Sequence, residues 1–340
     1  MIDPVIEQLL QAVEHDPAPA RYTSSYWRQY TAQNTARMED GRLVLRGFGI
    51  GDVGQPRLHG RCLHQLERLS YRRVTLRFQA YPVVWRMTKR LARDLGYGLT
   101  FDVWKSAVIL ALLVDHWKAA RLSPKTFAMI GDGYGFLGAL IRQALPGIRM
   151  CCIDLPTMLV FQATTHHRAD PKAILTFRSE GKGADEPSAA DVILVLPQAI
   201  ERIPGPIDCA INVASMQEMN PLTIHTYFAF LRRRSGPQSR FYCLNRQRKV
   251  LPGGEVSSFS EYPWQEDDET FVDGACPFYT HFFSQYHASN GPRRLGLRVP
   301  FVNYFDGLHL HRLVRLAPRP SPRHPSLLKA CEQEREAHGA

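Results

Sequence analysis

Several features are absent from this chain. Its seven cysteines are scattered, and none form a CxxC pair or follow metal-ligand spacing. Lys105 and Asp115 interrupt the most apolar segment, 103–117, which is also shorter than the roughly 20 residues of a membrane-spanning helix. Residues 1–20 carry acids and no apolar core, so we expect no signal peptide. We therefore expect reduced cysteines, a cytoplasmic setting, no membrane association and no required metal.

The size and charge of the chain leave several classes of partner open. With 340 residues, of which 44% are hydrophobic, it can form one large domain or two with a packed core. The formal net charge of +10 would suit a polyanion, but the arginines are spread along the chain, which argues against nucleic acid. An anionic small molecule would use the same charge.

The most informative segment, 125–154, is predicted to form strand, glycine turn, helix and strand. An apolar run at 127–130 stops at the loop 131–135, Gly-Asp-Gly-Tyr-Gly, and apolar residues then recur at helical spacing. Glycines accept positive φ and let a ligand approach the backbone, and a helix start offers unpaired N–H donors. The second strand closes on Asp154, whose carboxylate can accept hydrogen bonds from both hydroxyls of a ribose.

Two cofactor motifs fit this loop equally. Gly131, Gly133 and Gly135 make the GxGxG turn of class I S-adenosylmethionine sites. Gly133, Gly135 and Gly138 satisfy the GxGxxG of dinucleotide-binding folds. A tight strand-to-helix turn followed by an ordinary surface Asp154 would need no ligand at all. The spacing leaves these interpretations open.

Residues 1–122 are predicted to be mostly helical and to form a cap ahead of an α/β domain at 123–318. Helical spacing covers 75–95 and 101–121. The aromatic cluster at 22–30 could close over a ligand as a lid, although aromatic residues at helical spacing are more often core. A large helical region commonly takes part in dimer contacts, so a homodimer is compatible with it. The remainder, residues 319–340, is predicted to be a flexible tail.

The α/β domain is predicted to contain a doubly wound, mostly parallel sheet. The runs 191–197 and 207–214 are continuously apolar, as in parallel strands covered on both faces. Downstream, 295–302 and 308–316 are predicted to be two strands joined by a short turn, without an intervening helix. A parallel sheet that ends in an antiparallel strand hairpin favours a methyltransferase over a dehydrogenase.

Five segments carry a resemblance to a known family. They are Tyr26-Trp27-Arg28-Gln29-Tyr30, the loop from Ile130 to Gly135, Ile153-Asp154-Leu155-Pro156, the run from Ile211 to Met219, and Phe241-Tyr242-Cys243-Leu244-Asn245. On these segments the chain resembles the sugar O-methyltransferases, a class I S-adenosylmethionine-dependent group from bacterial polysaccharide and natural-product clusters. One departure is Met129, which stands where the family often has an acid; Asp132 is a candidate substitute.

The resemblance implies methyl transfer from S-adenosylmethionine to a hydroxyl of a sugar or glycosylated metabolite. Together with strand-end logic, it implies the following cofactor-binding residues: Gly131, Asp132, Gly133, Gly135, Asp154, Leu155, Leu196, Pro197, Gln198, Ser215 and Met216. Gln198 would bond the edge of the adenine, and Ser215 and Met216 would line the floor below the sulfonium.

Glu218 is the first candidate for the base that deprotonates the acceptor, because it follows the strand 207–214. Equally, it could cap the next helix. Gln217 could orient the acceptor or touch the cofactor, and His281 is a second-rank base.

Two rival functions stay open from the sequence. The first is an NAD(P)-dependent oxidoreductase, which the GxGxxG spacing supports. The second is a non-catalytic or RNA-binding protein on a methyltransferase fold, suggested by Met129 and the basic charge.

Overall fold

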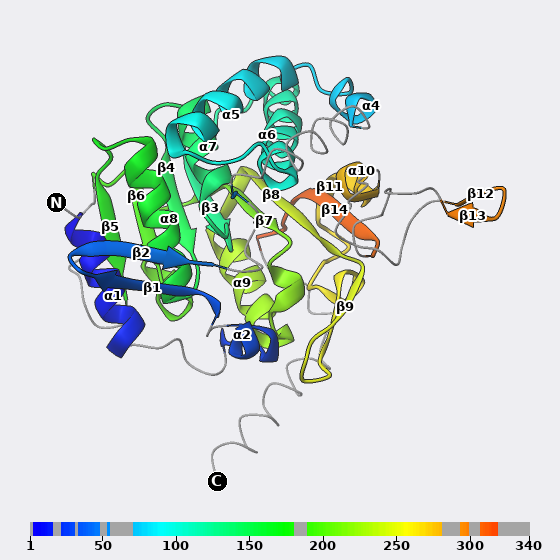
Figure 1. The fold of residues 1–340 in the computed structure, drawn as a ribbon. Coiled ribbons are helices and arrows are strands. Elements are labelled where there is room, and N and C mark those ends of the chain that lie inside the picture. Colours follow the sequence, from blue (N-terminus) through cyan, green and yellow to red (C-terminus); the bar gives the residue numbers. More distant parts are fainter. Residues whose placement is uncertain are drawn as a thin grey trace, which may run out of the picture.

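A computed structural model describes residues 3–15, 22–30, 33–47, 53–54, 71–179, 189–280, 293–298 and 307–318, and the structural statements below concern these residues. The central feature is an eight-stranded sheet (Figure 1). Its strands are β3 (Thr126–Ile130), β4 (Arg149–Ile153), β5 (Leu175–Arg178), β6 (Val192–Val195), β7 (Ile207–Val213), β8 (Ser235–Arg246), β11 (Glu269–Ala275) and β14 (His309–Arg315). They lie in the order β11, β14, β8, β7, β3, β4, β6, β5.

The sheet has the parallel centre that the sequence predicted. Strands β5, β6, β4, β3, β7 and β8 run parallel, whereas β14 is antiparallel to both β8 and β11. The chain order reverses between β3 and β7, so right-handed crossovers place helices on both faces. The insertion of an antiparallel last strand between β8 and β11 is the arrangement of Rossmann-like class I methyltransferases. The predicted fold class is confirmed.

One predicted strand pair is wrong in its partner. Strand β14 lies within the predicted segment 308–316, but it pairs with β11 rather than with 295–302. Within 295–302 the structure describes 295–298 only, where β13 (Leu297–Arg298) pairs with β12 (Arg293–Arg294). Strand β11 was not predicted from the sequence. It is a half-exposed edge strand that contains Asp273 and Gly274, and both residue types are rare in strands.

The helices lie mainly around this sheet. They are α1 (Pro4–His15), α2 (Ser25–Tyr30), α4 (Arg72–Thr75), α5 (Tyr81–Leu95), α6 (Phe101–Ala119), α7 (Phe136–Ala144), α8 (Pro156–Ala169), α9 (Pro221–Arg234) and α10 (Pro277–Thr280). Short 3₁₀ turns occupy Pro197–Arg202, Met216–Glu218 and Phe259–Glu261. The predicted helices at 75–95 and 101–121 correspond to α5 and α6.

The N-terminal region is less helical than predicted. Strands β1 (Thr35–Glu39) and β2 (Arg42–Arg46) form an antiparallel hairpin. Its turn, Asp40-Gly41, has φ of 48° and 73°, as a two-residue hairpin turn requires. This Asp-Gly dipeptide is the signal that could have revealed the hairpin. Helix α1 packs on α8, and α5 and α6 pack on α7, so these segments lie against the α/β core. The predicted boundary at residue 122 stays a prediction, and 319–340 lies outside the described residues.

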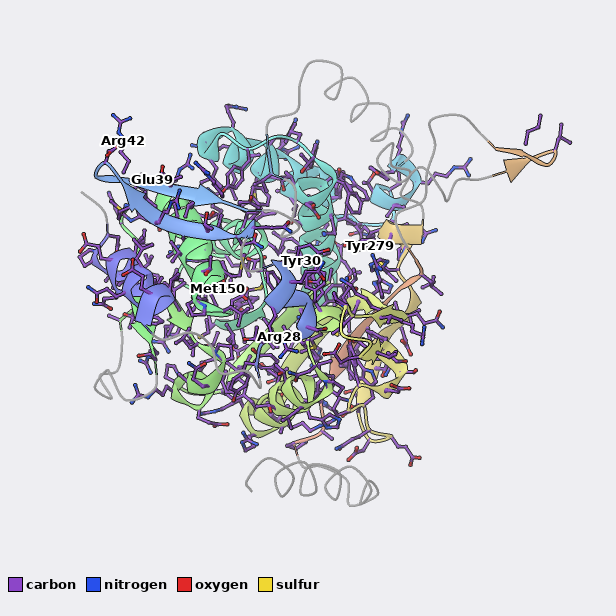
Figure 2. The ribbon with its side chains drawn as sticks, turned by 60° about the horizontal axis from the view of Figure 1, so that its bottom comes forward. Arg28, Tyr30, Glu39, Arg42, Met150 and Tyr279 are labelled. Carbon is purple, nitrogen blue, oxygen red and sulfur yellow. The ribbon has the colours of Figure 1, made fainter. Side chains whose placement is uncertain are left out.

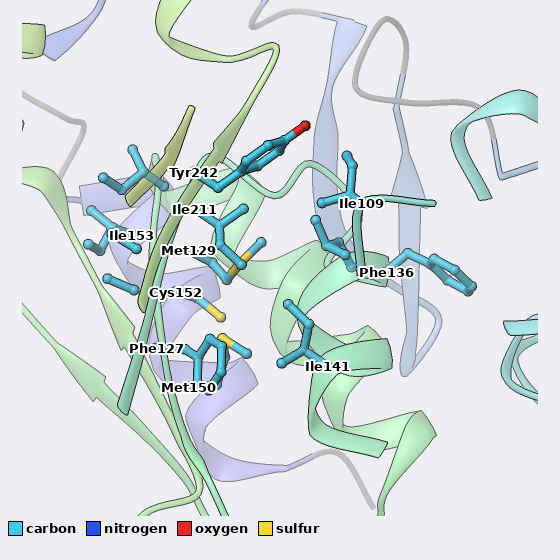
Figure 3. Packing of buried hydrophobic residues seen from close by; sticks show 14 of the residues in the cluster. Ile109, Phe127, Met129, Phe136, Ile141, Met150, Cys152, Ile153, Ile211 and Tyr242 are labelled. Atoms are coloured by element: carbon cyan, nitrogen blue, oxygen red, sulfur yellow. The ribbon is translucent and has the colours of Figure 1, made fainter. Parts of the chain in front are cut away.

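Helix α6 is buried over most of its circumference, which explains why its sequence is apolar on every side. Figure 3 shows Ile109 of α6 and Phe136 of α7 beside β3, whose Met129 is 2% exposed. Met129 therefore belongs to the packed core. In the part of the chain that the structure describes, no helix has the length and apolarity needed to cross a bilayer. The five cysteines within that part are all buried and unbridged.

A second small hairpin bears on the site. Strands β9 (Arg248–Val250) and β10 (Val256–Ser258) pair antiparallel just after β8. In Figure 1 this hairpin extends from the sheet close to α2. The side-chain view in Figure 2 shows α2, with Arg28 and Tyr30 labelled, lying across the middle of the molecule.

Candidate functional site

The glycine loop joins β3 to α7 at the carboxyl edge of the sheet. Gly131, Gly133 and Gly135 all have positive φ, of 70°, 55° and 80°. Two of them also lack room for a side chain. A Cβ on Gly131 would overlap the Oγ of Ser215, and a Cβ on Gly135 would lie 2.9 Å from the Cα of Gln162 in α8. The glycines therefore serve both the turn and the close approach of neighbouring segments.

We expect Gly131→Ala to destabilise the fold by about 2–5 kcal/mol, because left-handed strain and overpacking against Ser215 add together. Thermal unfolding would measure the loss. Gly147→Ala is the matched control, since Gly147 has φ of 75° but no atom within 4 Å of the added Cβ. Equal destabilisation by the two substitutions would show that Ser215 does not constrain the loop.

Asp132 holds the loop to the helix that follows. Its Oδ2 accepts a hydrogen bond from the N–H of Gly138 at 2.8 Å, so the carboxylate faces the start of α7. Burial raises the pKa of Asp132 to about 7, and the nearby Asp154 adds to the increase. Asp132 thus links the glycine loop to the first turn of α7, and its Oδ2 points toward that helix.

Asp154 lies directly after β4, as its sequence position predicted. Its two oxygens accept hydrogen bonds from the N–H of Leu155 at 2.8 Å and the Nε2 of Gln162 at 2.7 Å. Burial raises the pKa of Asp154 to about 7, and Glu218 adds to the increase. The carboxylate is thereby held in one orientation at the sheet edge, with lone pairs left for a ligand's hydroxyls.

The segment after β6 lies next to Asp154. The N–H of Asp154 donates to the carbonyl of Val195 at 3.3 Å, which brings these two strand ends together. Leu196 and Pro197 are buried at this junction. The Oε1 of Gln198 is buried and has no hydrogen-bond partner among the described residues. A buried acceptor of this kind is costly unless a donor completes it, and the exocyclic amine of adenine is such a donor.

The segment after β7 supports the loop from below. Ser215 Oγ donates to the carbonyl of Ile130 at 3.0 Å, and Asn212 Nδ2 donates to the same carbonyl at 2.8 Å. Met216 is fully buried. The Oε1 of Gln217 accepts from the N–H of Arg246 at 2.7 Å, which ties this segment to β8. Ser215 and Asn212 thus form a hydrogen-bonded support under the glycine loop, and the role of Ser215 and Met216 as a floor for the cofactor stays a prediction.

Glu218 lies in the same turn, only 9% exposed. Its Oε1 forms an ion pair with Lys249 Nζ at 2.7 Å, and the nearby Tyr26 side chain lowers the pKa of the carboxyl. Burial raises the pKa of Glu218, while Lys249 opposes the increase. Its alternative role as a helix cap is wrong, because Asn220 is the N-cap of α9 and accepts from the N–H of Thr223 at 2.9 Å.

The aromatic cluster lies next to the turn that contains Glu218. No residue of α2 is fully buried, although Trp27 packs partly against the core, and the ring centroids of Tyr26 and Tyr30 are 4.6 Å apart. Polar contacts hold the segment: Ser24 Oγ donates to the carbonyl of Glu218, and Ser25 Oγ donates to Glu255 Oε2 at 2.6 Å. Closure of this cluster over a ligand stays a prediction.

The prediction of His281 as a second-rank base stays a prediction. His281 lies outside the described residues. His166 Nε2 lies 3.6 Å from Cys152 Sγ, whereas His167 Nδ1 lies 3.5 Å from Asp3. Burial lowers the pKa of His166 to about 3. The two neighbours therefore face different partners, and the described ranges contain no group of three or more His, Cys, Asp or Glu residues suited to a metal ion.

Two residues of the site were missed as partners of Glu218. Lys249 is distant in sequence and follows a different strand, so no spacing pattern links it to Glu218. Tyr26 was noticed as part of an aromatic cluster, but an interaction between residues so far apart in the chain leaves no local signal. Both became visible only through the packing of α2 and β9 around the turn that contains Glu218.

Among known proteins, similarity to this chain is found in solved structures only. No family model and no curated protein matches the chain. Solved structures that match include mitomycin 7-O-methyltransferase MmcR, with 16% identity over 69% of this chain and 60% of that one, at a TM-score of 0.35. Magnesium protoporphyrin IX methyltransferase (ChlM) from Synechocystis PCC 6803 has 12% identity over 62% and 81%, at 0.37. TehB from Haemophilus influenzae has 13% identity over 60% and 61%, at 0.38. Likenesses this distant carry no argument about the reaction of this chain.

Proposed function

We propose that this protein is an S-adenosylmethionine-dependent O-methyltransferase that methylates a hydroxyl of a sugar or glycosylated metabolite. The observation that carries the proposal is the meeting of a glycine loop, the Asp154 carboxylate and the unpaired Gln198 Oε1 at neighbouring strand ends. These groups fit the amino-acid part, the ribose and the adenine of that cofactor. Asp154 would accept from the ribose hydroxyls, and Gln198 from the adenine amine.

When bound, the cofactor supplies a methyl group already activated on a sulfonium, so little covalent help is needed from the protein. The residues of this chain then have two tasks. They hold the acceptor hydroxyl in line with the methyl group, which can account for most of the rate gain. They also take its proton, because a neutral hydroxyl is a poor nucleophile. Glu218 has the chemistry and the position for the second task.

The acceptor class is supported by the surroundings of Glu218. Tyr26 has a half-buried ring next to the Glu218–Lys249 pair, Tyr30 packs on Tyr26, and aromatic faces pack well against the C–H faces of sugar rings. Arg246 acts electrostatically on both Glu218 and Tyr26, so an acceptor with an anionic group would also be accommodated. A homodimer and a cytoplasmic location remain part of the proposal.

The cofactor assignment is tested by thermal unfolding of the full chain with S-adenosylhomocysteine, NAD or NADP. We expect stabilisation by S-adenosylhomocysteine alone, by about 2.7 kcal/mol at a concentration 100 times its dissociation constant. Stabilisation by a dinucleotide alone would reject the proposal in favour of an oxidoreductase. Retention on an RNA column at high salt would instead favour a nucleic-acid-binding role.

The reaction is tested by incubating the protein with methyl-labelled S-adenosylmethionine and extracts of its source. Mass spectrometry should find the label on the oxygen of a sugar-containing product. Label on a nitrogen would keep the cofactor assignment and reject O-methylation.

We expect cofactor affinity to depend on pH around neutrality. Burial raises the pKa of both Asp132 and Asp154 to about 7, so the folded protein holds protons that the unfolded chain releases above pH about 4. Stability without cofactor should therefore fall as pH rises from 4 to 7. Affinity for S-adenosylhomocysteine should rise about tenfold between pH 6 and 8, because ionised Asp154 accepts from two hydroxyls. Calorimetry at both pH values measures this, and a flat profile would contradict it.

A further inference from the structure

Two side chains that are far apart in the sequence lie at Glu218. Lys249 of β9 contacts one carboxylate oxygen at 2.7 Å, and the Tyr26 side chain of α2 acts electrostatically on the same carboxyl. The two also contact each other, since the Nζ of Lys249 lies 4.1 Å from the centre of the Tyr26 ring. All three side chains are at most half-exposed. Lys249 therefore contacts both the Glu218 carboxylate and the Tyr26 ring.

Resting on the proposed function, we propose that Tyr26 and Lys249 are positioning residues that together orient the Glu218 carboxylate toward the acceptor hydroxyl. A carboxylate offers about four lone-pair positions on two oxygens. The lysine ammonium occupies one of them, and the Tyr26 ring holds that ammonium in place through a cation–π contact, so rotation of the carboxylate is restrained. At least one remains for the hydroxyl of the acceptor.

The proton balance of the step follows from this arrangement. The acceptor oxygen forms a bond to the methyl carbon while the bond from that carbon to sulfur breaks, and the sulfur keeps the electron pair. The hydroxyl proton moves to Glu218, which becomes a neutral acid. Lys249 keeps its own proton throughout, and its charge then favours loss of the proton from Glu218 to water.

Several charged or titratable groups face Glu218. They are Tyr26 of α2, Asp154 after β4, Arg246 at the end of β8, Lys249 of β9 and Tyr262. Burial raises the pKa of Glu218, and Lys249, Arg246 and Tyr26 act in the opposite direction. Lys249 has the largest effect of these three, because it forms the direct ion pair. Loss of Lys249 should therefore move the ionisation of Glu218 to higher pH.

The first test needs no acceptor. Infrared spectra of the full chain are recorded as a function of pH, and the difference between the wild type and Glu218→Gln isolates the carboxyl band of Glu218. We expect Lys249→Met to move the midpoint of this band upward, Tyr26→Phe to move it upward by less, and Lys249→Arg to leave it near its original value. The exposed Lys172→Met is the matched control. An unmoved midpoint in both Lys249→Met and Tyr26→Phe would overturn the proposal.

The second test uses turnover once an acceptor is known. On the acid side of the pH–rate profile, Lys249→Met should be about tenfold or more below its own plateau at a pH where the wild type is still near its plateau. A purely structural role would lower the rate at every pH without displacing this limb. If the wild type methylates no sugar although the band of Glu218 moves as expected, then the proposed function fails and the positioning contact stands.

Discussion

Glu218→Gln should lower methyl transfer by about 10²- to 10⁴-fold, while affinity for S-adenosylhomocysteine stays unchanged. The amide is nearly the same size as the carboxylate, but it cannot accept the proton of the acceptor. Glu218 lies after β7, whereas Asp154, the proposed acceptor for the ribose hydroxyls, lies after β4. In the proposed function, cofactor binding and proton removal therefore depend on separate strand ends. Steady-state turnover and calorimetric binding of S-adenosylhomocysteine measure the two effects separately.

Glu269→Gln is the matched control for this substitution. Glu269 is exposed at the start of the edge strand β11 and pairs with Arg315 at 2.7 Å, with no contact to α2 or to Glu218 among the described interactions. Its substitution should leave turnover within about twofold, as is usual for surface changes. Unchanged turnover in Glu218→Gln would remove Glu218 as the base. A parallel loss of cofactor affinity would instead assign it to cofactor binding.

Asp154→Ala should weaken binding of S-adenosylhomocysteine by about 10²- to 10⁴-fold. Each hydrogen bond to a charged group contributes about 1.5–3 kcal/mol, and two ribose hydroxyls would lose their acceptor. The substitution also removes the partner of Gln162 Nε2, which holds α8 next to the glycine loop. Asp154→Asn keeps the shape and should weaken binding less, since the amide retains one acceptor oxygen.

Calorimetry at pH 8 measures this effect, with Asp170→Asn as the control acid. Asp170 follows the C-terminal end of α8 and pairs with Arg142, whereas Asp154 precedes the N-terminal end of the same helix. Its substitution should leave affinity unchanged. If Asp154→Ala binds S-adenosylhomocysteine as tightly as the wild type, then this carboxylate does not hold the ribose and the cofactor assignment loses its main support.

The strand-loop-helix unit at 125–154 could be predicted because its signals are local. The apolar run, the three glycines and the acid after the second strand all lie close together in the sequence, within 125–154. The same holds for β6 and β7, whose continuous hydrophobicity reflects burial on both faces. Strand ends in a parallel sheet meet at one edge, so the approximate place of the site followed as well.

Long-range partnerships could not be predicted in this way. The pairing of β14 with β11, rather than with 295–302, depends on which segment reaches the open side of β14. The exposed position of α2 depends on polar contacts to a hairpin more than two hundred residues later. The pattern of aromatic residues in α2 is the same whether the helix is core or lid, so composition could not separate the two.

The amino-acid sequence alone determined the parallel sheet, the glycine turn and the acids at the strand ends, because each arises from residues that are neighbours along the chain. Three-dimensional packing decided what surrounds Glu218. Burial changes the free energy of a charge, and packing brings Lys249 to within 2.7 Å of a carboxylate distant in sequence and places the Tyr26 ring against that lysine. The chemistry of that carboxylate is therefore a property of the folded molecule, and no residue type or spacing contains it.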